Sequence, residues 1–363
     1  MRINLRIFVV GVVLWAGGAG SGLADDVARM EEVIQARVKD SSFMGSVLVA
    51  RDAEIVLNKG YGFANVEWQI ANSPTTRFRL GSLTKQFTSA SILLLEERGK
   101  LKIEDHIKQY VPDAPAAWDA ITIYNLLTHT SGLPNYTALP DFATTMGTKV
   151  TPQQIVAKFR DRPLDFEPGT KMLYSNSGYI VLGLIIETVS GESYASFLQK
   201  NLFDPIGMKD SGYDSSTAIS PRRASGYTPG PDGPLNAAFL DMSIPYAAGA
   251  LYSTTEDLLR WEKALFGGKV LKAASLEKMT KPFKNDYALG VSVRQHGPDR
   301  GRREKRLGVL SRIAGLGDRA IPVSREARWQ RSGGARDPCR RARDARLSDF
   351  PGWPLGVPHL VAG

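Results

Sequence analysis

Hydrophobic positions near the start of the chain recur with two different periods, which predict a helix and then a hairpin. Residues 25–40 place their apolar side chains at helical spacing, on one side of the segment. Residues 45–50 and 54–58 are two short apolar runs joined by a tight turn, as in an antiparallel hairpin. A third apolar run, residues 83–98, widens until the predicted helix is buried on most sides, and Gly99 ends it.

Further along, the pattern predicts helices joined by loops rich in proline and glycine. The segments with helical spacing are residues 121–129, 152–159, 179–189, 192–202 and 254–266. In the last of them, Thr254 or Thr255 is the expected N-cap. Residues 287–293 are expected to form a strand. Strands therefore lie at both ends of the body and helices lie between them, an α/β (α+β) arrangement without internal repeats.

The first 24 residues have the pattern of an export signal. Arg2 and Arg6 give a short basic start, residues 7–19 form an apolar run, and small residues precede Asp25. The alternative is a membrane anchor, but the run is shorter than the ~20 residues that a helical span needs. We therefore expect a mature protein that begins near Asp25, is secreted or periplasmic, and keeps no membrane span.

The net charge of +9 is concentrated at one end of the chain. Residues 1–299 contain 31 basic and 31 acidic side chains, whereas residues 300–363 contain 15 basic and 6 acidic ones. Of those 15, 14 are Arg and one is Lys305, and this segment has no sustained helical or strand period. It also contains the single cysteine, Cys339, which excludes an intramolecular disulfide.

We separate this anomalous tail, residues 299–363, from a single domain at residues 25–298, and two explanations compete for it. A basic extension would bind nucleic acid or another anionic surface. A frameshift in a GC-rich gene would instead give wrong-frame codons rich in Arg, Gly, Ala and Pro. We favour the frameshift because a binding arm usually mixes Lys with Arg and carries few Leu or Trp. No nucleic-acid partner is therefore expected.

Ser82 and Lys85 stand three residues apart at the mouth of an apolar run. A serine hydroxyl is a poor nucleophile until a base lies within hydrogen-bonding distance. Residues i and i+3 of a helix share a face, so Lys85 can point at Ser82. Burial would lower the pKa of the lysine enough for it to act as a base. The alternative is that Ser82 only caps a helix, which is a common use of serine.

The same spacing occurs a second time, at Ser275 and Lys278. No glycine precedes this serine, a charged residue lies inside the motif, and the predicted helix at residues 272–279 is expected to be solvated. We therefore interpret Ser275 as structural.

Tyr-x-Asn occurs once in the chain, at residues 174–176. Together with Ser82 and Lys85 it makes the chain resemble the superfamily of serine β-lactamases and penicillin-recognising proteins. The likeness is greatest to class C β-lactamases, the D-Ala-D-Ala carboxypeptidases of that branch and related esterases. It runs from about residue 27 to about residue 294. The matching segments are FRLGSLTK at residues 78–85, LLTHTSGLP at 126–134, YSNSGY at 174–179, PIGM at 205–208, AGALYSTTEDL at 248–258 and YALG at 287–290.

The resemblance implies a β-lactamase-like fold, with an antiparallel sheet flanked by helices and a helical subdomain, and it assigns roles to four residues. Ser82 would attack a carbonyl and become acylated, while Lys85 and Tyr174 would share its proton. Tyr174, with a depressed pKa, would protonate the leaving group, and Asn176 would hydrogen-bond Lys85 and the substrate amide. The backbone N–H of Ser82 would be one oxyanion donor. No metal or cofactor is implied.

His129 invites a Ser-His-Asp interpretation, which we reject. The chain contains no Gly-x-Ser-x-Gly elbow, the turn that carries the nucleophile in α/β-hydrolases. The resemblance makes the loop that contains His129 architectural.

The chain departs from the superfamily at its third motif, Lys/His-Thr/Ser-Gly. That motif would supply the second oxyanion donor and a group that recognises the substrate carboxylate, and no Lys-Thr-Gly or His-Thr-Gly occurs in the chain. His296-Gly297 follows the predicted strand too closely, and Arg331-Ser332-Gly333-Gly334 lies in the anomalous tail. Because the loss begins where the composition breaks, we expect the C-terminal strands of the sheet and the C-terminal helix to be missing.

Two functions are compatible with these observations. The first is an exported serine hydrolase that transfers an acyl group to Ser82 and then to water, from a D-Ala-D-Ala-like peptide of peptidoglycan, a β-lactam or an ester. Peptidase or esterase activity is expected ahead of efficient β-lactamase activity. The alternative is a catalytically impaired penicillin-binding-like protein whose site is half built. The oligomeric state is left open.

Overall fold

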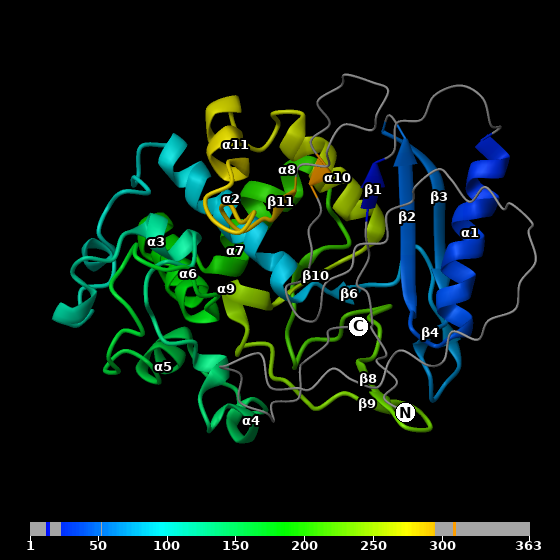
Figure 1. The fold of residues 1–363 in the computed structure, drawn as a ribbon, viewed down its shortest axis with the longest axis horizontal. Helices are drawn as coiled ribbons and strands as arrows, with labels where there is room; N and C mark the ends of the chain where they lie inside the picture. The colour runs from blue at the N-terminus through cyan, green and yellow to red at the C-terminus, as the bar shows by residue number, and fades with distance from the viewer. Residues whose placement is uncertain (1–11, 15–22, 52, 295–307, 310–363) are drawn as a thin grey trace, which may run out of the picture. The chain divides into compact units, whose positions relative to one another are not determined.

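The computed structural model describes residues 12–14, 23–51, 53–294 and 308–309 of the 363-residue chain. All of them belong to one of the two compact units into which the chain divides. Helices and strands are mixed in this unit, and its strand pairs are antiparallel except at the N-terminal edge, as Figure 1 shows. The predicted α/β class is therefore confirmed.

The first predicted helix and hairpin are both present, and the hairpin belongs to the N-terminal sheet. Helix α1 (Leu23–Lys39) is followed by strands β2 (Gly45–Arg51) and β3 (Glu54–Tyr61), which pair antiparallel with a bulge after Val49. Strand β1 (Val12–Leu14) pairs in parallel with β2. It lies inside the segment that the sequence pattern marks as an export signal.

Helices lie on both faces of this sheet. Lys59 of β3 donates to Glu31 of α1 at 3.1 Å, whereas its neighbour Asn58 donates to Glu256 at 2.9 Å. Glu256 belongs to α10 (Thr255–Phe266). Because successive strand residues point to opposite faces, α1 and α10 cover opposite sides of the sheet (Figure 1).

The main core surrounds α2 (Thr84–Glu97), which packs against α6 (Asn176–Ser190) and α9 (Tyr246–Gly249). Nearly all of α2 is buried, which confirms the prediction from its widened apolar face. Gly183 of α6 allows the close approach of α9, because a Cβ there would lie 2.3 Å from the ring of Tyr246. The burial of α2 on all sides determines the environment of any polar residue that it carries.

A second small sheet leads the chain into α2. Strand β10 (Leu251–Ser253) pairs antiparallel with β6 (Phe78–Arg79) on one side and with β7 (Gly212–Tyr213) on the other. Arg79 donates from Nε to Oδ2 of the buried Asp214 at 2.7 Å, just after β7. Pairing with β10 and the ion pair to Asp214 therefore fix the position of Arg79, from which the chain turns towards α2.

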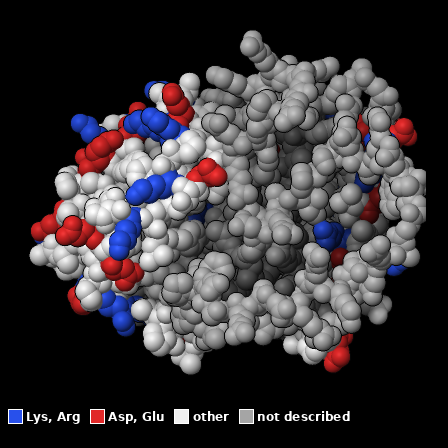
Figure 2. Space-filling model, in the orientation of Figure 1, with Lys and Arg blue, Asp and Glu red and all other residues white. Residues whose placement is uncertain are grey.

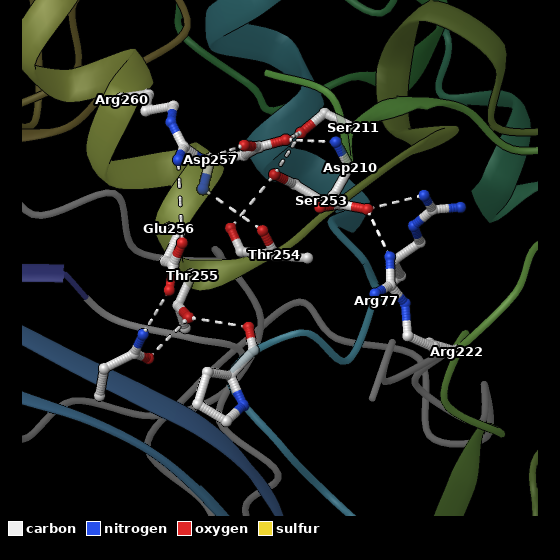
Figure 3. Close-up of polar contacts among 12 residues, drawn as sticks. Arg77, Asp210, Ser211, Arg222, Ser253, Thr254, Thr255, Glu256, Asp257 and Arg260 are labelled. Atoms are coloured by element: carbon white, nitrogen blue, oxygen red, sulfur yellow. Dashed lines mark hydrogen bonds and ion pairs between the residues drawn. The ribbon is translucent and has the colours of Figure 1, made fainter. Parts of the chain in front are cut away.

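A partly buried polar network anchors Arg77, the residue before β6, as Figure 3 shows. Asp257 of α10 accepts hydrogen bonds at Oδ2 from the backbone N–H of Asp210 and from Ser211 Oγ, both at 2.8 Å. Asp210 in turn accepts at Oδ1 from Arg77 at 2.8 Å and from Arg222 at 2.7 Å. Because the carboxylate of Asp257 is buried and its partners are charged or fixed, this network joins α10 rigidly to the start of β6.

The predicted helices of the middle region are present; most are shorter than their apolar patterns, whereas α6 extends beyond the predicted residues 179–189 at both ends. α3 begins with a capping box at Thr122, and α7 is continued by a π-turn at residues 199–203. Thr254 caps α10, where its hydroxyl accepts the N–H of Asp257 at 3.3 Å. The helices are α3 (Ile123–Leu127), α4 (Phe142–Thr145), α5 (Pro152–Ala157), α7 (Tyr194–Leu198), α8 (Asp204–Ile206) and α11 (Ala273–Thr280).

Four further short strands lie before residue 287 in the described chain. They form two hairpins, β4 (Phe63–Asn65) with β5 (Ile70–Ala71) and β8 (Tyr227–Gly230) with β9 (Gly233–Asn236). Among the described helices, none is by itself long and apolar enough to cross a membrane, and one pair, at residues 176–190 and 194–206, meets that criterion only jointly, with a bend of 75°.

The predicted strand at residues 287–293 is wrong. Residues 287–292 form a compact turn instead, in which Ala288 N–H donates to Val291 O at 2.8 Å, and only β11 (Val293–Arg294) is extended. Gly290 has φ +73°, and a Cβ there would lie 2.7 Å from Lys85 O. Glycine therefore allows this turn to pack directly on α2, which an extended strand would not do.

Strand β11 pairs antiparallel with β12 (Gly308–Val309), which lies in the predicted tail. The remaining residues from 295 onwards lie outside the described chain, so the expectation that C-terminal strands and a helix are missing falls on residues that the structure does not describe.

Charges of both signs are mixed on the described part of one face of the molecule. Figure 2 shows Lys and Arg side chains interspersed with Asp and Glu on the face drawn. This mixture agrees with the balanced charge of residues 1–299.

Candidate active site

Ser82 lies in a single 3₁₀ turn, Gly81–Leu83, between β6 and α2. Gly81 has φ +52°, a conformation that glycine adopts readily, and this bend points the chain from the sheet into the helix. The N-caps of the turn and of α2 are Leu80 and Leu83, neither of which uses a side chain. Ser82 therefore does not cap a helix, and its hydroxyl bonds to other side chains instead.

Lys85 is the buried partner of Ser82. Its side chain is in the core, and Nζ lies 3.1 Å from Ser82 Oγ, 2.9 Å from Asn176 Oδ1 and 2.8 Å from the carbonyl oxygen of Ala248. Asn176 Oδ1 and Ala248 O can only accept hydrogen bonds, so they take two protons of Nζ. The third tetrahedral position of Nζ faces Ser82 Oγ, where it holds a proton in the ammonium and the lone pair in the neutral amine.

Burial lowers the pKa of Lys85 to about 7. Desolvation disfavours the charged ammonium. A substantial fraction of Lys85 is therefore neutral near neutral pH, with a lone pair directed at the serine hydroxyl. That is the arrangement a general base requires.

Tyr174 approaches Ser82 from the other side. Its Oη lies 2.6 Å from Ser82 Oγ, and its ring lies 4.8 Å from Lys85 Nζ. Burial raises the pKa of Tyr174 to about 12, against the smaller lowering effect of its hydrogen bond with Ser82. The expected depressed pKa of Tyr174 is therefore wrong, because desolvation outweighs the hydrogen bond. The phenol is protonated at neutral pH and is suited to donate a proton.

Asn176 is the first residue of α6 and orients Lys85. Its Oδ1 accepts from Lys85, while its Nδ2 donates to Thr137 Oγ1 at 3.1 Å. Its backbone N–H donates to Asn135 Oδ1 at 3.1 Å, and Thr137 donates to the same oxygen. Both ends of the amide are thus used, and this fixes which atom faces Lys85.

The four predicted residues, Ser82, Lys85, Tyr174 and Asn176, therefore meet at one site although 94 positions separate the first from the last. The sequence interpretation missed two partners, Ala248 and Thr137. Ala248 belongs to a segment that carried the family resemblance, but it acts through a backbone carbonyl, which no residue type reveals. Thr137 follows the conspicuous LLTHTSGLP segment by three positions and has no motif of its own.

The alternatives at other residues are excluded by geometry. His129 hydrogen-bonds through its ring to Tyr287 Oη and to the N–H of Ser175, so it is not the base of Ser82. The helix of Ser275 is exposed on one face, at Ala273, Ala274, Glu277 and Lys278, as expected, although Ser275 itself is buried. Lys278 turns away from Ser275 to Glu96 Oε2 at 2.9 Å.

Within the described residues, no group of three or more His, Cys, Asp or Glu side chains could hold a metal ion. His296-Gly297 and Arg331-Ser332-Gly333-Gly334, the two sequences compared with the third motif, lie outside the described residues.

Comparison with known families agrees with this geometry. The model of the family described as Beta-lactamase matches residues 30–317. This chain belongs to the beta-lactamase family. The match covers most of the chain and continues past residue 298, where the composition begins to change.

Individual relatives give the same result. The putative penicillin-binding protein PbpX of Bacillus subtilis (strain 168) is 34% identical over 257 residues, which are 70% of this chain and 63% of that protein. The penicillin binding protein from Bacillus halodurans has a TM-score of 0.65 at 30% identity, with 72% of this chain and 83% of that chain covered. The D-amino acid amidase from Ochrobactrum anthropi SV3 has a TM-score of 0.61 at 26% identity, with 71% and 76% covered.

This chain thus spans less than two thirds of the length of PbpX. The relatives confirm the resemblance to serine β-lactamases and penicillin-binding proteins and the fold that it implied.

Proposed function

We propose that this protein is an exported serine hydrolase that cleaves an amide or ester through an acyl-enzyme on Ser82. The observation that carries the proposal is the bonding of Lys85. Its Nζ is held by two acceptors, Asn176 Oδ1 and Ala248 O, so that its third position faces Ser82 Oγ at 3.1 Å. A general base needs its lone pair directed at the nucleophile, and this arrangement provides it.

Acylation follows from the positions of three groups. Neutral Lys85 takes the proton of Ser82 as Oγ attacks the substrate carbonyl. The peptide N–H of Ser82, in the 3₁₀ turn that leads into α2, stabilises the oxyanion. When the tetrahedral intermediate collapses, the bond from carbon to the leaving nitrogen or oxygen breaks and Tyr174 donates its proton to that atom. The ammonium of Lys85 then returns a proton to Tyr174, because Ser82 Oγ is now an ester oxygen and carries none.

Deacylation repeats these steps with water. A water molecule in the place of the leaving group gives a proton to neutral Lys85 and attacks the ester carbonyl. When the second tetrahedral intermediate collapses, Ser82 Oγ leaves and takes this proton from Lys85. The enzyme returns to its starting state, with no net change in its protons.

The substrate class that we propose is a peptide amide or ester with a D-configured residue at the scissile bond, such as a D-Ala-D-Ala-like peptide of peptidoglycan. Two named similarities support it, to penicillin-binding proteins and to a D-amino acid amidase. The export signal predicted at residues 1–24 would bring the enzyme to such a substrate outside the cytoplasm, and N-terminal sequencing of the protein from the periplasm or medium tests it.

A second candidate function is a penicillin-binding-like protein that acylates but does not turn over. The absence of Lys-Thr-Gly and His-Thr-Gly from the chain favours it, because the group that recognises the substrate carboxylate has no counterpart in the sequence.

Labelling with a fluorescent penicillin and with a fluorophosphonate tests both. We expect covalent labelling of the full chain at Ser82 that Ser82→Ala abolishes, while Ser275→Ala leaves it unchanged. Release of the label and turnover of a D-Ala-D-Ala peptide would support the hydrolase; a label that persists would support the second candidate. A folded wild-type protein that takes up neither probe would contradict both.

A further inference from the structure

His129 holds the backbone on both sides of Tyr174. Its carbonyl oxygen accepts the N–H of Leu173 at 3.0 Å, and its ring Nδ1 accepts the N–H of Ser175 at 3.3 Å. The backbone N–H groups of the residues before and after Tyr174 therefore both bond to one residue, 45 positions away from Tyr174 in the chain. The ring of His129 also lies against the ring of Tyr174, with 4.4 Å between centroids.

The hydrogen bonds define the tautomer of His129. Because Nδ1 accepts the N–H of Ser175, the proton of the neutral ring is on Nε2, which donates to Tyr287 Oη at 2.9 Å. Burial, together with the charge of Lys85, lowers the pKa of His129 well below its usual 6.5. The ring therefore stays neutral, and Nδ1 stays an acceptor, over the pH range in which a hydrolase works.

Tyr287, the anchor of this ring, is fixed to the helix of the nucleophile. Tyr287 begins the compact turn at residues 287–292, and its carbonyl oxygen accepts the N–H of Phe283 at 2.7 Å. Three residues later, Gly290 rests on α2, where a Cβ would lie 2.4 Å from Ser89 Oγ. A rigid path therefore runs from α2 through Tyr287 and His129 to the backbone of Tyr174.

We propose that His129, held by Tyr287, is a positioning residue that sets the distance of 2.6 Å between Tyr174 Oη and Ser82 Oγ. It takes up and releases no proton in the reaction. The proposal rests on the proposed function insofar as Tyr174 protonates the leaving group. It also explains why the segments LLTHTSGLP and YALG, which supply no catalytic atom, meet directly behind Tyr174.

Three substitutions separate the contacts of His129. His129→Leu removes the acceptor for Ser175 and the donor to Tyr287. His129→Asn keeps an acceptor close to the position of Nδ1, and asparagine tolerates the φ of +58° at this position better than other residues. Tyr287→Phe removes only the hydroxyl and keeps the ring, so it is the variant expected to fold in every case.

The test uses two substrates with the same acyl group, a p-nitroanilide and a p-nitrophenyl ester. The aniline needs a proton to leave and the phenolate does not. We expect Tyr174→Phe to lower kcat for the anilide by about 10²-fold or more, as loss of a general acid does, with a far smaller loss for the ester. His129→Leu should lower kcat for the anilide by about 10-fold to 100-fold with little change in KM, Tyr287→Phe should lower it less, and His129→Asn should recover most of the loss.

A double-mutant cycle decides whether His129 acts through Tyr174. If it does, His129→Leu added to Tyr174→Phe costs less than about twofold further, because the group that it positions is already gone. Additive losses in folded variants would overturn the proposal, as would a Tyr287→Phe enzyme with unchanged kcat for the anilide. Equal losses of Tyr174→Phe on both substrates would instead refute the acid role of Tyr174, and the cycle would still decide the role of His129.

Discussion

The two halves of the site are built in different ways. Ser82 and Lys85 lie one helical turn apart on the same buried segment, so their proximity follows from the local backbone. Tyr174 lies in a loop at the N-terminus of α6, and its position depends on His129 and on contacts between residues far apart in the chain. The nucleophile half therefore has its geometry from secondary structure and its reactivity from burial, whereas the acid half has its geometry from tertiary hydrogen bonds.

The largest expected effect is loss of the base. Lys85→Met removes the lone pair that faces Ser82 and should lower kcat/KM by about 10²-fold to 10⁴-fold, the usual contribution of general base catalysis. The matched control is Lys278→Met, in the second Ser-x-x-Lys segment, where the lysine pairs with Glu96 at the surface and contributes at most about 1 kcal/mol to stability. Steady-state kinetics on an activated ester measure both variants. Similar losses in the two would contradict the assignment of the base.

The pH dependence of kcat/KM should report the titration of Lys85. Its neutral form is the base, and burial lowers its pKa to about 7. The rate should therefore rise about tenfold per pH unit below pH 7 and level off above it, because protonation of the free enzyme removes the base. A pH–rate profile with the p-nitrophenyl ester, from pH 5 to 9, checks the sign. A profile that falls as the pH rises through 7 would show that the charged form of Lys85 is the active one.

A smaller effect is expected from Thr137, which supports the base indirectly by holding Asn176. Thr137→Val keeps the shape of the side chain but removes the acceptor of Asn176 Nδ2, a hydrogen bond worth about 1 kcal/mol. Because Asn176 then orients Lys85 less firmly, kcat/KM should fall about fivefold. The control is Thr144→Val, an exposed position on α4 whose hydroxyl bonds only to Asp141 O. Unchanged kinetics in Thr137→Val would show that Asn176 needs no support from this side.

The comparison of the two halves also explains which residues of the site could be predicted from the sequence. The helical spacing and the apolar run indicated Ser82 and Lys85 directly. Tyr174 and Asn176 were found only through the family resemblance, because nothing local marks a tyrosine in a loop as a partner of a serine 92 positions earlier. Ala248 was not found, because its function is that of a backbone carbonyl.

The errors have physical causes of the same kind. Residues 287–293 have the composition of a strand, but the positive φ of Gly290 and its close approach to α2 produce a turn. Tyr174 was expected to have a depressed pKa, but its burial, which no motif displays, raises the pKa to about 12. In both cases a long-range contact outweighed the local pattern.

The sequence by itself determined the class of the fold, the buried helix α2, the N-terminal helix and hairpin, and the pairing of Ser82 with Lys85. These features rest on periodicity and on contacts within one helical turn. The tertiary structure alone decided that Lys85 has a pKa of about 7, that Tyr174 remains a proton donor, and that His129 holds Tyr174 in place. Desolvation and the direction of a hydrogen bond depend on everything that surrounds a side chain, and that surrounding exists only once the chain has folded.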